Sequence, residues 1–116
     1  MSKSLDKLIR EVDSWLEKEI NENAAIQSCF KDFLTSSAQL YMSNFFINIS
    51  SKSELVAAAE KKQRAQEYII SEFLKKNEIR NADDVDVYRM LLTNNLESRM
   101  NMGDIESFRK LVRVHD

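Results

Sequence analysis

"SKSELVAAAEKKQRAQEYIISEFLKKN", residues 51–77, is the stretch that decides the fold class of this chain. It begins with the pattern S-x-x-E from Ser51 to Glu54, the capping box that opens many helices. Two lysines occupy its last turn, where cations interact favourably with the helix dipole, and we expect Asn77 at the C′ position that follows. A helix over 52–76 would be about 36 Å long at 1.5 Å per residue, the span of a small domain.

The rest of the chain has the same helical character. Its 116 residues include no proline and one glycine, whereas β-rich folds depend on these residues for their many tight turns. Apolar residues recur with the 3-4 spacing of a helix over 4–20, from 24 to a point between 41 and 49, over 82–102 and beyond 104. The sequence therefore predicts an all-α fold, a single compact bundle of four to five antiparallel helices that forms one domain over 1–116.

Polar residues mark the expected helix ends. Asn23 and Asn81 each precede a periodic segment and are predicted N-caps, because an asparagine side chain can accept hydrogen bonds from the first free backbone N–H groups. Gly103, the one glycine of the chain, is expected to end the fourth helix or to form the turn after it. Asp104 would then cap a fifth helix.

Charge and composition exclude several classes of function. The net charge is −2, and it is −2, +2 and −2 over residues 1–48, 49–76 and 77–116, so broad binding to the nucleic-acid backbone is not expected. One cysteine permits no internal disulfide. The sequence shows no signal-peptide pattern and no apolar run of the roughly 20 residues that a membrane span needs. We therefore expect a cytoplasmic protein that does not enter membranes.

Catalytic and metal-binding patterns are missing from the sequence. His115 is the one histidine and stands next to the last residue, where a catalytic base is seldom held rigidly. Cys29 lies on an apolar stripe and is expected to be a small buried hydrophobe. One His and one Cys are too few ligands for a zinc site, and a phosphate-binding loop needs several glycines. We predict no enzyme activity, no catalytic residues, no cofactor, no metal and no small-molecule substrate.

One spacing near the end of the chain suggests a different possibility. In "RKLVRVH", residues 109–115, five residues separate Arg109 from His115. This spacing resembles the R-x(4–6)-H motif of the HEPN-domain ribonucleases, in which the Arg and the His cut RNA across a dimer. The resemblance would make Arg109 and His115 the active pair. The resemblance covers seven residues. The family prefers a polar residue directly after its Arg, and Lys110 occupies that position here.

The densest apolar run is "YMSNFFINI", residues 41–49. If the helix that begins near residue 24 continues through it, Met42, Phe46 and Ile49 fall at i, i+4 and i+7 on the side opposite the main apolar stripe. A second apolar stripe is either buried inside this protein or covered by a partner, because a soluble monomer rarely leaves one exposed. Both interpretations remain open from the sequence.

The helix over 52–76 carries two polar residues on its predicted buried face. That face consists of Leu55, Ala59, Ile69, Ile70 and Phe73. Lys62 and Gln66 lie in its middle. An unpaired buried ammonium group is very costly, so Lys62 either extends its amine to solvent or meets a carboxylate. These two residues could also form a groove or a polar layer that selects a helical partner.

The leading hypothesis is a non-enzymatic helical interaction module, such as an adaptor, chaperone, inhibitor or assembly subunit. It would bind a protein partner or a second copy of itself, helix against helix, through Met42, Phe46, Ile49, Lys62 and Gln66. The alternative hypothesis is an accessory nucleic-acid-binding protein. That protein would use Lys61 and Arg64 of the cluster "KKQRAQ" over 61–66, together with the basic residues Arg109, Lys110 and Arg113. A cluster such as 61–66 is most often a solvated helix face, and nucleic acid is the less expected partner.

Overall fold

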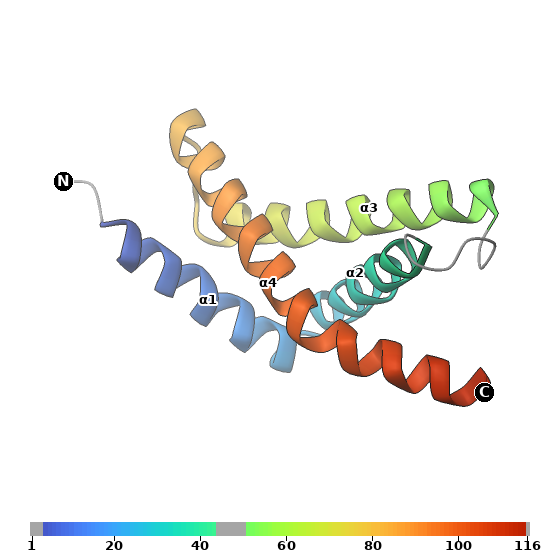
Figure 1. Ribbon diagram of the computed structural model, residues 1–116. Coiled ribbons are helices and arrows are strands. Elements are labelled where there is room, and N and C mark those ends of the chain that lie inside the picture. Colours follow the sequence, from blue (N-terminus) through green and yellow to red (C-terminus); the bar gives the residue numbers. More distant parts are fainter. Residues whose placement is uncertain (1–3, 44–50, 116) are drawn as a thin grey trace.

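The computed structural model describes residues 4–43 and 51–115, and it describes side chains for 4–41 and 51–100. Within these residues the chain forms four α-helices and no strand, which confirms the all-α prediction. The helices are α1 (Leu5–Glu22), α2 (Ala24–Ser43), α3 (Lys52–Lys76) and α4 (Ala82–His115). Together they make an elongated bundle that measures 55 × 25 × 25 Å (Figure 1).

All four helices begin at residues that satisfy free backbone N–H groups. The Ser4 and Ser51 hydroxyls accept from the N–H groups three residues on, at 3.4 Å and 3.3 Å. Asn23 accepts at 3.0 Å and 3.2 Å from the N–H groups two and three residues on, and Asn81 accepts at 2.9 Å and 3.2 Å in the same pattern. Because capping is a local interaction, these starts follow directly from the sequence.

The end of α3 differs in detail from the prediction. Asn77 is the C-cap, with φ −97°, and its side-chain amide donates to the carbonyl of Phe73 at 2.8 Å. The left-handed conformation falls one residue later, on Glu78 with φ 53°. Asn77 can close the helix with its own side chain, so the reversal of the chain moves to the next residue.

The predicted break at Gly103 is wrong. Helix α4 runs without interruption from Ala82 to His115, so Asp104 does not cap a fifth helix. A glycine inside a helix costs only about 1 kcal/mol relative to alanine, because it keeps its N–H group and loses only backbone entropy. The helix-forming residues on both sides are sufficient to offset that cost.

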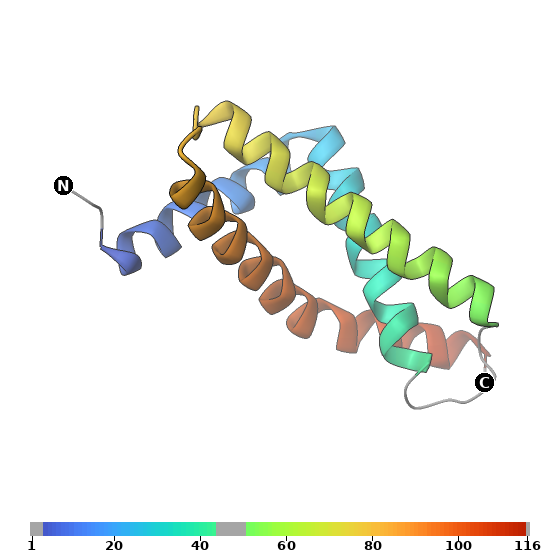
Figure 2. The ribbon, with the colours of Figure 1, turned by 90° about the horizontal axis from the view of Figure 1, so that it is seen from above.

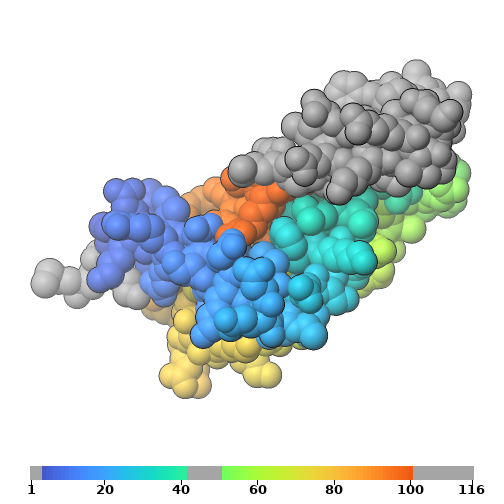
Figure 3. Space-filling model, turned by 90° about the horizontal axis from the view of Figure 1, so that it is seen from below, coloured from blue at the N-terminus to red at the C-terminus, as the bar shows by residue number. Residues whose placement is uncertain are grey.

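Helices α1 and α2 meet at a corner. One residue, Asn23, separates them, and its extended backbone (φ −105°, ψ 110°) is too short a link to reverse the chain. Figures 1 and 2 show that α2 leads on from the end of α1, whereas α3 returns along α2 and α4 runs forward again. Seen from below, α1 and α2 lie on the same face of the molecule, and part of α4 is visible between them (Figure 3).

This corner makes α1 and α4 parallel, so the prediction that all neighbours are antiparallel is wrong for this pair. Their contacts pair residues whose numbers rise together, namely Glu11 with Tyr88, Asp13 with Asn95, and Glu17 with Arg99. The α3–α4 pair is antiparallel, because its contacting residues run in opposite order: Lys62 with Glu97, Gln66 with Thr93, and Glu67 with Arg89.

The hydrophobic core draws side chains from every helix. The buried cluster contains Val12, Leu16, Ile26, Phe33, Ala65, Ile69, Ile70, Phe73, Tyr88, Leu91, Leu92 and Leu96. Phe73 lies among the aromatic residues, with its ring 5.1 Å from those of Trp15 and Tyr88. Burying a side chain of this size contributes about 1.5–3 kcal/mol, so this cluster holds α1, α3 and α4 together.

Three predicted buried positions, one on α3 and two on α1, are exposed. On α3 the buried alanine is Ala58, at 4% exposure, whereas Ala59 faces solvent. On α1 the predicted apolar stripe is buried at Val12 and Leu16, but its first turns leave Leu5 57% and Ile9 43% exposed.

Candidate functional site

The predicted partner-binding stripe is mostly outside the described residues. The stripe forms only if the helix continues through residues 41–49. The structure describes α2 as far as Ser43. Phe46 and Ile49 lie in the segment 44–50, and the side chain of Met42 also lies outside the described part. The choice between core and interface for these three residues stays open.

Apolar side chains are exposed on both helices that flank this segment. Tyr41, in the last turn of α2, is 48% exposed, and Val56, near the start of α3, is 51% exposed. Figures 1 and 2 show the end of α2 and the start of α3 at the same end of the molecule. We call Tyr41 and Val56 together the α2–α3 tip. The sequence pattern did not indicate Val56, because one valine beside three alanines gives no clear face.

Lys62 has a carboxylate partner, which was one of the two arrangements predicted for its amine. Its amine lies 3.1 Å from Glu97 on α4 and 5.4 Å from the centre of the Phe33 ring on α2. The Lys62 side chain keeps 25% of its area exposed and Glu97 keeps 38%, so both charges still contact water. The Lys62 amine on α3 therefore contacts both α2 and α4, and its charge stays partly in contact with water.

Replacing Lys62 tests whether its charge or its alkyl chain matters more. We expect Lys62→Met to change the free energy of unfolding by less than about 1 kcal/mol, because a half-exposed ion pair contributes little. Lys62→Ala should cost more than Lys62→Met, since it also removes the methylene groups of a side chain that is only 25% exposed. Urea unfolding followed by circular dichroism measures both. Equal losses in the two variants would show that the charge carries the effect.

Gln66 also lies in a polar contact within the chain. Its amide donates to the Thr93 hydroxyl at 3.4 Å, and that hydroxyl donates to the Arg89 carbonyl at 2.8 Å. Next to it, Arg89 donates to both oxygens of Glu67 at 2.6 Å and 2.8 Å. Lys62 and Gln66 thus belong to a polar seam between α3 and α4. A role of these two residues in binding a partner stays a prediction, and a partner would have to compete with these contacts.

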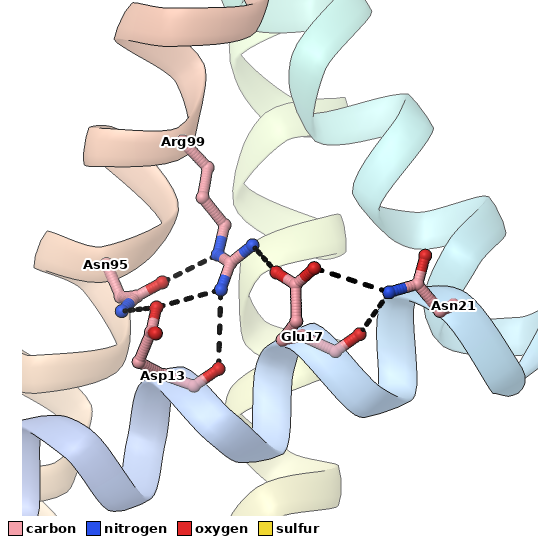
Figure 4. Close-up of polar contacts among 5 residues, drawn as sticks. All are labelled: Asp13, Glu17, Asn21, Asn95 and Arg99. Carbon is pink, nitrogen blue, oxygen red and sulfur yellow. Dashed lines mark hydrogen bonds and ion pairs between the residues drawn. The ribbon is translucent and has the colours of Figure 1, made fainter.

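A second polar cluster, which the sequence did not indicate, joins α4 to α1 (Figure 4). The Arg99 guanidinium donates to the Asp13 carboxylate at 2.9 Å and to the Glu17 carboxylate at 2.7 Å. It also donates to Asn95 at 2.7 Å and to the Asp13 carbonyl at 3.3 Å. Its donors are largely used by contacts within the protein, so this cluster positions helices and offers little to a ligand.

The contact with Arg99 changes the pKa of Glu17. A hydrogen bond from Arg99 and the positive charge of the same group lower the pKa of the Glu17 carboxyl below its ordinary value of 4.5. Because the pKa is lower in the folded state, the ionised carboxylate stabilises the fold at pH values above the unfolded-state pKa. That stabilisation is lost as the pH falls through the folded-state value.

We therefore expect Glu17→Gln to be less stable than the parent protein near neutral pH. The difference should shrink at an acidic pH well below the ordinary value of 4.5, because protonation of the parent carboxylate then removes the ionic contact. Urea unfolding at the two pH values measures the difference, and Glu22→Gln, an exposed carboxylate of the same helix, is the control. A difference that stays constant with pH would show that the ionic contact does not stabilise the fold.

The basic cluster over 61–66 is partly neutralised. Lys61 lies 3.6 Å from Asp32 of α2, and each of these side chains is about half exposed. Arg64 is exposed on α3, and Tyr68, one turn further along, is 40% exposed. Because an acidic residue accompanies the cations, this face matches a solvated helix surface better than a binding surface for a polyanion.

Of the residues considered for catalysis, the structure describes the side chain of Cys29 alone. Cys29 is partly buried, and this burial, followed by the nearby charge of Asp32, raises the pKa of its thiol, which disfavours the reactive thiolate. Arg109 and His115 are on α4 but outside the described side chains, so the ribonuclease resemblance stays a prediction.

Three further features of the described residues concern metal binding, membrane crossing and surface recesses. In 4–41 and 51–100 no three His, Cys, Asp or Glu side chains gather as they would around a metal ion. Of the helices described, none combines the length and the apolar character that crossing a membrane requires. A shallow recess lies on α1, and its described lining residues, Lys7, Arg10, Glu11 and Ser14, all come from that one helix.

Among the described residues, the candidate site is the α2–α3 tip, whose two residues stand on either side of the segment 44–50 in the sequence. Comparisons with known protein families, with curated proteins and with solved structures found no match.

Proposed function

We propose that this protein is a non-enzymatic helical interaction module that binds a protein partner or a second copy of itself through the α2–α3 tip. The observation that supports this proposal is the exposure of Tyr41 and Val56 at 48% and 51%. In the sequence these two residues flank the apolar run that contains Phe46 and Ile49. Exposed apolar side chains that gather at one place often mark a contact surface, whereas scattered ones are ordinary.

The polar clusters support the same assignment by exclusion. Lys62, Gln66 and Arg99 make contacts between helices, so their described role is to hold the bundle together. The α2–α3 tip has apolar groups at the surface and lies at one end of the elongated bundle, where a partner helix can approach without disturbing the core. Helix against helix is the simplest mode of contact for such a surface.

The tip is tested by placing a charge on it. We expect Val56→Asp to reduce capture of the partner, or formation of a dimer, at least tenfold, because an unpaired carboxylate in an apolar contact costs more than about 1.4 kcal/mol. Tagged protein would be captured from native lysate with and without nuclease, and its mass in solution measured by light scattering. Phe46→Asp should have the same effect if the segment and the tip form one surface.

Met90→Asp is the matched control. Met90 is 53% exposed on α4, so a carboxylate there would also contact water, but Met90 is not part of the tip. Loss of binding in Val56→Asp with retention in Met90→Asp would support the proposal. Equal binding by all three variants, each shown to be folded by circular dichroism, would contradict it, and so would a parent protein that is monomeric and captures nothing.

A further inference from the structure

We draw no further inference here: the strongest candidate, the exposed apolar pair Leu5 and Ile9 on the first turns of α1, continues a stripe that is buried at Val12 and Leu16, but nothing in the structure shows what covers it.

Discussion

Phe73→Ala is expected to lower the free energy of unfolding by about 3–5 kcal/mol, the usual cost of removing a buried aromatic side chain. Phe73 has no exposed area, and its ring lies edge-on to Trp15 of α1 and tilted against Tyr88 of α4, each at 5.1 Å. The substitution removes the aromatic contact of α3 with both helices and leaves a cavity between them. Urea unfolding followed by far-ultraviolet circular dichroism measures the loss.

Such a loss is a large part of the stability of a small domain, which is typically about 5–15 kcal/mol. Phe73→Leu therefore serves as a milder variant that should stay folded and lose less. Met90→Ala changes a side chain that is 53% exposed and should stay within about 0.5 kcal/mol of the parent. If Phe73→Ala is no more destabilising than Met90→Ala, then α1, α3 and α4 do not meet at this ring.

Ala58→Leu is expected to destabilise the protein by about 1–3 kcal/mol through overpacking. Ala58 is 4% exposed on α3. The contact of Lys61 with Asp32 sets the register of the antiparallel α2–α3 pair, and one turn further along α2 lies Ser36, which is 3% exposed. Because both residues are small and buried, we infer that a leucine at position 58 would push α2 and α3 apart.

The neighbouring alanine supplies a control that is matched in chemistry and helix position. Ala59 is exposed, so Ala59→Leu should change the free energy of unfolding by less than about 0.5 kcal/mol. The same unfolding measurement separates the two possible faces of α3. A larger loss in Ala59→Leu than in Ala58→Leu would restore the buried face that the sequence pattern predicted.

That error about α3 shows where sequence patterns lose information. Three consecutive alanines at 57–59 are equally small and apolar, so they do not determine which of them faces the core. The capping residues, in contrast, act within three or four positions of themselves. Ser51, Asn23 and Asn81 therefore predicted helix starts correctly, and the all-α class followed from the helices that they begin.

Other features involve residues far apart in the sequence. Lys62 was expected to need a carboxylate, but nothing in the local pattern identified Glu97, 35 positions away, as that partner. The contacts of Arg99 with α1 span 82 and 86 positions and had no local signal. The candidate site also depends on such contacts. The composition of 41–49 indicates an apolar run, whereas the exposure of Val56 depends on how α2 and α3 pack.

The corner at Asn23 has a consequence for the order in which the protein folds. Helices α2 and α3 are neighbours in sequence and can pair early, because a short connection costs little entropy to close. The contacts of α1 with α4 join residues 77 to 86 positions apart, so they close a loop of most of the chain and form slowly. We therefore expect α1 to dock last and to detach first, with its backbone amides the earliest among the described helices to exchange with deuterium.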